Sequence, residues 1–264
     1  MIILLHVLVA AMYAITAWVG WPRGTADGQR RTLAPGLLAV ALVLHAIAAW
    51  RSIARPDGLD LSFENALSLV AGLAVLAAWL GGVLQRLPGV ASVVLPVTAV
   101  CALLPLAGSP HPFALAGAPW AAAHIAVALV AYALFVVVAM QALVMTGLEK
   151  RLHRGQPDAH ASSRPLLSLE RYMFRLLSVG FALLTLTLAT GMLFSEEIFG
   201  KPMMLTDKIV FSVAGWLAFA VLLFGRWRYG WRGRTALKWI LAGTLLLVLG
   251  YLGSKFMREV VLGR

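Results

Sequence analysis

The sequence has one cysteine, few charged residues and no covalent haem-attachment motif. Cys101 is the only cysteine in 264 residues, so an internal disulfide and a thiolate cluster for zinc or iron–sulfur are excluded. A Cys-x-x-Cys-His motif is absent, so the chain does not attach haem to itself covalently. Charged residues make up only 12% of the chain, about half of their share in soluble domains.

The usual signatures of hydrolases and NTPases are also missing. There is no Gly-rich phosphate-binding loop, no His-Glu-x-x-His motif and no Ser–His–Asp order. Glu196 and Glu197 are adjacent in a short connection and lack the spacing of an acid–base pair. We therefore expect a protein that is not an enzyme. The net charge of +11 does not indicate nucleic acid, because the basic residues lie between apolar runs.

Apolar residues dominate the sequence. Hydrophobic residues make up 61% of the chain, and membrane-spanning helices need about 20 of them in a row. We predict an all-α bundle of eight transmembrane helices, at residues 2–20, 33–50, 64–84, 89–107, 119–147, 172–194, 207–225 and 235–254. Pro96 and Pro105 interrupt the fourth run, so neighbouring helices must satisfy its freed carbonyl groups if it spans the membrane.

The distribution of positive charge predicts the orientation of these helices. The connections on one side carry 15 of the 22 Lys and Arg residues, and the richer side is normally cytoplasmic. Both termini are then on the outer side. Five helices occupy residues 1–147, a polar cytoplasmic linker occupies 148–171, and three helices occupy 172–264.

Histidines collect on the outer side of this arrangement. His6, His45 and His124 each lie about five residues, or roughly 7 Å of helix rise, inside the outer end of a run, and His111 lies in the outer connection 108–119. Neutral imidazole suits a transition metal or haem iron, and His124 with any of the other three could ligate one iron from two sides. Alternatively, each histidine hydrogen-bonds to a neighbouring helix.

Small residues surround His124. Alanines at positions 121, 122, 123, 126, 128 and 131 would let a helix or a flat ligand approach the backbone closely. Trp120 is a candidate platform beside the histidine, although tryptophans at span ends are typical of an interfacial belt. Tyr132 lies about 12 Å deeper along the helix, where it lines the same cavity or, as we favour, belongs to the core.

Several segments together resemble a known family. Trp120-x-x-x-His124-Ile, Ala131-Tyr132-Ala-Leu-Phe, Leu205-Thr-Asp207-Lys208 and Gly230-Trp231-Arg232-Gly233-Arg234 resemble the cytochrome c assembly superfamily. Within it, the chain is similar to small eight-helix bacterial inner-membrane proteins of the YpjD and HemX type, related to the haem-delivering CcsA. The resemblance covers about residues 120–254.

The resemblance implies a multi-pass inner-membrane protein that handles haem at the periplasmic face during cytochrome biogenesis. It implies His124 as an axial ligand, and membrane or periplasmic cytochrome-assembly proteins as partners. The sequence lacks the family's Trp-rich haem-binding loop, has Asp207 where a histidine is usual, and has no histidine in its C-terminal tail. A second axial ligand must then come from His111, His45 or His6.

Two other functions stay open. The missing histidine at position 207 and the missing Trp-rich loop favour a haem-free membrane protein that regulates or stabilises another protein. A small-solute transporter is a third possibility, which predicts paired charges or broken helices at the bilayer midplane. Apart from the proline-interrupted fourth run, the sequence shows neither sign.

Overall fold

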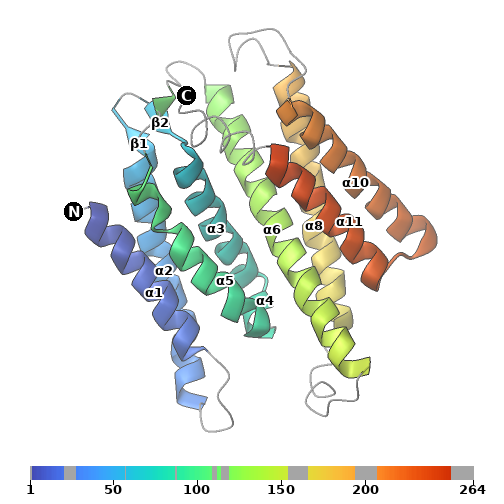
Figure 1. Ribbon diagram of the computed structural model, residues 1–264, viewed down its shortest axis with the longest axis horizontal. Helices are drawn as coiled ribbons and strands as arrows, with labels where there is room; N and C mark the ends of the chain where they lie inside the picture. The colour runs from blue at the N-terminus through green and yellow to red at the C-terminus, as the bar shows by residue number, and fades with distance from the viewer. Residues whose placement is uncertain are drawn as a thin grey trace. The chain divides into compact units, whose positions relative to one another are not determined.

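The computed structural model describes residues 2–20, 28–56, 58–86, 88–108, 112–113, 119–153, 166–193 and 207–250. Over these ranges the chain is almost entirely helical (Figure 1), which confirms the expected helical fold. The chain divides into two compact units, Met1–Ala116 and Gly117–Arg264. The fifth predicted helix therefore belongs with the helices that follow it, and not with the four that precede it.

The first unit is built from four longer helices and one short one. They are α1 (Ile2–Val19), α2 (Gly28–Ile53), α3 (Phe63–Leu80), α4 (Val83–Arg86) and α5 (Pro88–Cys101). Helix α1 packs against α2 and α5, and α3 packs against the same two helices. Each long helix of this unit thus has two long neighbours, and side chains that point between them are buried.

A small sheet follows α2 in the first unit, which the sequence did not indicate. Strands β1 (Ala54–Arg55), β2 (Gly58–Asp60) and β3 (Pro112–Phe113) pair antiparallel in that order. Gly58, the first residue of β2, has a φ of 143°, a conformation that favours glycine. The Arg55 guanidinium lies 3.1 Å from the buried Asp60 carboxylate, so the sheet encloses an ion pair.

The fourth predicted span, 89–107, is broken in the structure. Helix α5 ends at Cys101, and a 3₁₀-helix, η1 (Leu104–Leu106), follows it. In an α-helix the carbonyl of Ala102 would accept from the N–H of Leu106, but that N–H donates to Leu103 instead, at 3.0 Å. The carbonyl of Ala102 is therefore available to a side chain.

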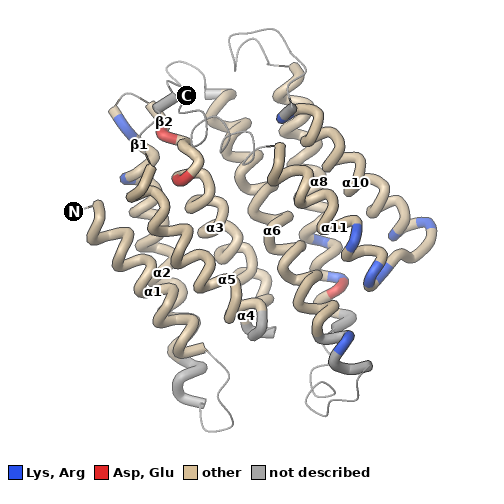
Figure 2. The backbone as a smooth tube through the Cα atoms, in the orientation of Figure 1, with Lys and Arg blue, Asp and Glu red and all other residues tan. Residues whose placement is uncertain are grey.

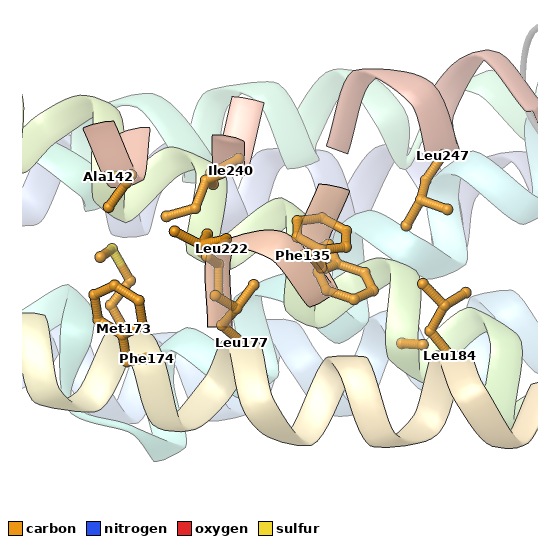
Figure 3. Packing of buried hydrophobic residues seen from close by; sticks show 14 residues of the cluster. Phe135, Ala142, Met173, Phe174, Leu177, Leu184, Leu222, Ile240 and Leu247 are labelled. Atoms are coloured by element: carbon orange, nitrogen blue, oxygen red, sulfur yellow. The ribbon is translucent and has the colours of Figure 1, made fainter. Parts of the chain in front are cut away.

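The second unit consists of α6 (Pro119–His153), α8 (Leu166–Leu193), α10 (Asp207–Tyr229) and α11 (Gly233–Val248). Helix α6 packs along α8 and α11, and α10 packs along α11 and α8. Their shared core contains Phe135 and Phe219, whose rings stack in parallel with centroids 4.2 Å apart. Figure 3 shows Phe135 among leucine, isoleucine and methionine side chains of the same cluster.

Among the residues that the structure describes, six helical segments are long and apolar enough to cross a membrane: Ile2–Val19, Leu33–Ile53, Phe63–Leu80, Trp120–Gly147, Ser168–Leu193 and Lys208–Tyr229. The apolar stretch Val90–Leu106 is shorter, and α11 has 16 residues. Six of the eight predicted spans thus meet this criterion, and the outward termini stay a prediction. Helix α6 runs on to His153 and α8 already begins at Leu166, so both ends of the predicted linker 148–171 are helical.

Candidate functional site

His124 lies in the second turn of α6 and contacts α8. Its Nδ1 is 2.9 Å from the Thr190 hydroxyl oxygen. That hydroxyl has one hydrogen, which it donates to the carbonyl of Leu186 at 2.8 Å, so it accepts a hydrogen bond from the Nδ1–H of His124. The lone pair of the imidazole is then on Nε2.

The next residue of α8, Gly191, lies close to the ring of His124. A Cβ added to Gly191 would lie 3.1 Å from Cε1 of His124, closer than ordinary van der Waals contact. Thr190 therefore sets the tautomer, and Gly191 leaves just enough room for the half-buried ring. Histidines that bind metals show the same pattern, because a hydrogen bond from one ring nitrogen orients the other toward the metal.

The other aromatic residues near His124 have different surroundings. The side chain of Trp120, one turn earlier on α6, is 66% exposed, which fits an interfacial residue and leaves its face accessible to a ligand. Tyr132 is partly buried and packs against the hydrophobic core of the second unit. The structure thus favours the core role for Tyr132.

His6 links three helix ends in the first unit. Its Nδ1–H donates to the carbonyl of Ala102 at 2.7 Å, so its Nε2 accepts from the Ser52 hydroxyl at 2.8 Å. The side chain is fully buried. Both nitrogens of His6 are therefore engaged by the first unit itself.

His45 has two protein partners as well. Nδ1 is 3.0 Å from the Tyr13 hydroxyl, and Nε2 is 3.1 Å from the Ser68 hydroxyl. Gly72 approaches the ring so closely that an added Cβ would lie 2.8 Å from Cε1 of His45. Coordination of a metal by either nitrogen would require one of these bonds to break.

His6 and His45 belong to the first unit and His124 to the second. His111 lies outside the described residues, and Asp207 is described only as the first residue of α10. Within the described ranges, no group of three His, Cys, Asp or Glu side chains is placed to hold a metal ion.

Sequence reasoning missed the partners of these histidines. Thr190, Ser68 and Tyr13 lie in apolar runs, and Ser52 follows the end of one. Ser and Thr hydroxyl groups in helices often bond within their own helix. Thr16 shows that ordinary case, since its hydroxyl donates to the carbonyl of Met12. A hydroxyl next to a glycine, as in Thr190-Gly191, is the one local signal of a place where another side chain can approach.

The Gly-Trp-Arg-Gly-Arg segment forms the turn between α10 and α11. Gly230 and Gly233 have φ values of 66° and 52°, which favour glycine over other residues. The turn folds the indole of Trp231 over Gly225, where a side chain would overlap it. Two arginines of this region bind Glu170 of α8, Arg226 at 3.0 Å and Arg232 at 3.5 Å.

Comparison with known proteins identifies relatives over most of the chain. A family model described as Cytochrome C assembly protein matches residues 33–262. The inner membrane protein YpjD of Escherichia coli K12 is 33% identical over 243 residues, which cover 89% of this chain and 90% of YpjD.

Shorter matches extend to other organisms. The cytochrome c biogenesis protein CcsA of the alga Heterosigma akashiwo is 31% identical over 94 residues, which cover 36% of this chain and 29% of CcsA. An uncharacterised 28.8 kDa protein of Azospirillum brasilense is 35% identical over 158 residues, 59% of this chain and 58% of that protein. No solved structure matches the chain significantly.

Proposed function

Because the chain belongs to the cytochrome c assembly protein family, we propose that it binds haem at the periplasmic face of the inner membrane, with His124 as an axial ligand. It is a multi-pass inner-membrane protein, as its relative YpjD is by name and as its long apolar helices require. Haem is cargo in this proposal. The chain does no covalent chemistry on it and is not an enzyme.

The hydrogen bond between His124 and Thr190 carries the proposal. It leaves the lone pair on Nε2, and an axial imidazole must offer a lone pair to iron. Thr190 and Gly191 hold the ring in one orientation before any ligand arrives, which lowers the ordering cost of binding. The alanines next to His124 on α6 would let the flat macrocycle approach the helix.

Each remaining histidine can be weighed as the second axial ligand. His6 and His45 each use both ring nitrogens in hydrogen bonds inside the first unit, so ligation would cost a buried bond. This argument does not apply to His111, which we therefore take as the candidate for the second axial ligand. The proposed pair of axial ligands is His124 and His111. The chain would deliver the bound haem to other assembly proteins.

A haem titration of the purified protein in detergent tests the proposal. The wild type should show a shifted Soret band that is lost or strongly weakened in His124→Ala. His153→Ala is the matched control, since it removes the same side chain at the far end of the same helix, and it should leave the band unchanged. A band that is identical in His124→Ala contradicts the proposal and favours the haem-free partner protein.

Thr190 provides a test of positioning. Thr190→Val keeps the shape but removes the acceptor for Nδ1–H, so we expect a changed midpoint potential or Soret position of the bound haem, because such hydrogen bonds tune the ligand. Thr190→Ser should restore the wild-type value. If valine and serine behave alike, the hydroxyl does not act on the ligand.

A further inference from the structure

A cavity of about 580 Å³ opens in the second unit beside the turn between α10 and α11. Its lining comes from α6, α8 and the start of α11. Part of this lining is apolar, and we call it the apolar wall; the rest is polar and charged, and we call it the charged wall. The lining residues are Ala142, Met145, Thr146, Glu170, Met173, Arg232, Gly233, Arg234, Thr235 and Leu237.

The charged wall has an excess of positive charge. Glu170 is its only acidic residue, and Arg226, which lies behind the lining, already neutralises it at 3.0 Å. Arg232 contacts the same carboxylate at 3.5 Å with a side chain that is 60% exposed. Arg234 makes no hydrogen bond or ion pair to any residue that the structure describes. An anion in the cavity would therefore meet two guanidinium groups.

The backbone adds to this charge. Helix α11 begins at Gly233, inside the lining, and has no acidic residue in its first turn. The N–H groups of a first helical turn have no partners within the helix and carry partial positive charge. Figure 2 shows further Lys and Arg residues gathered at the turn between α10 and α11.

The apolar wall suits a hydrocarbon chain. Met145 and Met173 are flexible side chains that adapt to irregular apolar ligands, and Leu237 extends the same surface. The cavity is lined by residues of the turn that directly follows α10, and at the end of α10 Trp227 is 81% and Tyr229 66% exposed. Such residues mark the boundary between lipid headgroups and acyl chains.

We propose that this cavity binds an anionic glycerophospholipid. Its phosphate lies against Arg232, Arg234 and the first turn of α11, and the start of its acyl chains lies against Met145 and Met173. A soluble phosphate ester shares the first half of this recognition but has nothing to place on the apolar wall. The site is separate from His124 and does not depend on haem.

The test uses the full-length protein in nanodiscs, with native mass spectrometry to count retained lipids. Phosphatidylglycerol should be retained over phosphatidylcholine, and Arg234→Gln should reduce its retention about five-fold, since one cation near a membrane surface contributes about 1 kcal/mol. Lys238→Gln is the control, because this exposed residue is one turn further on α11 and does not line the cavity. It should change retention little.

Two outcomes would overturn the proposal. Equal losses in Arg234→Gln and Lys238→Gln would mean that the lipid responds only to general surface charge. Binding of glycerol 3-phosphate in phosphatidylcholine nanodiscs, with an affinity equal to that of phosphatidylglycerol, would mean that the site takes soluble phosphates. Arg232→Gln serves as a second variant should Arg234→Gln fail to fold, with the same five-fold loss expected.

Discussion

The hydrogen bond between Tyr13 and His45 gives a test of whether His45 is structural. Tyr13 is fully buried, and its hydroxyl is 3.0 Å from Nδ1 of His45. Tyr13→Phe removes one oxygen and leaves the ring packing intact. It also leaves a buried imidazole nitrogen without its partner.

The expected loss of stability follows from the lost hydrogen bond and from the imidazole nitrogen left without a partner. Side-chain hydrogen bonds between membrane helices contribute about 0.6 kcal/mol on average and about 1.7 at most. An orphaned buried polar group costs about 1–3 kcal/mol, part of which His45 avoids by keeping its bond to Ser68. We expect Tyr13→Phe to lower the free energy of unfolding by about 1–2 kcal/mol, a factor of about 5–30 in the unfolding equilibrium.

Equilibrium unfolding by SDS in mixed micelles measures this loss. Tyr229→Phe removes the same hydroxyl from a side chain that is 66% exposed, and should change stability by less than about 0.5 kcal/mol. The haem titration of Tyr13→Phe should match the wild type. Wild-type stability in Tyr13→Phe, or a displaced Soret band, would refute the structural role of His45.

Three further substitutions test the packing of the second unit, each by the same unfolding measurement. Gly225→Ala places a methyl group into the indole of Trp231 and should cost about 1–3 kcal/mol; no loss would mean that the indole can move away. Phe219→Ala removes the ring stacked on Phe135 and should cost about 3–5 kcal/mol, with a smaller loss indicating that the core collapses into the space. Glu170→Gln removes the negative charge that two arginines bind and should cost about 1–2 kcal/mol, shrinking in high salt; a salt-independent loss would contradict the ion-pair explanation.

The sequence predicted the helices well because a membrane allows few alternatives. A backbone in hydrocarbon must satisfy its own hydrogen bonds, so an apolar run of sufficient length becomes a helix. The predicted ends of the helices were less accurate. Helix α6 continues from Gly147 to His153, because charged residues outside the hydrocarbon region do not stop a helix.

The histidines show what a single sequence leaves open. The number of residues between each histidine and the outer end of its apolar run gives its depth in the membrane. These depths placed His6, His45 and His124 in one layer. The direction in which a side chain points from its helix decides which partner it meets. That direction depends on tertiary contacts such as the one between His124 and Thr190, which are 66 residues apart. Apart from the glycine that follows Thr190, nothing in the sequence distinguishes the hydroxyl residues that bind these rings from hydroxyls that bond only within their own helices.

The position of the proline predicted only part of what happens after α5. Pro105 has no N–H to donate to Cys101, and a broken span was one expectation for this run. The structure adds that the neighbouring carbonyl, that of Ala102, is taken by His6. That partner is 96 residues away, and no local pattern could indicate it.

The hydrogen bond between His6 and Ala102 also affects how the protein folds while it is being synthesised. His6 leaves the ribosome before Ser52, and Ser52 leaves it before Ala102. Until Ala102 has been made, the Nδ1–H of His6 lacks its native acceptor, and a polar group without a partner is costly in hydrocarbon. Helix α1 therefore inserts before the hydrogen bonding of His6 is complete, and it gains its native contact with Ala102 only when the first unit is almost finished.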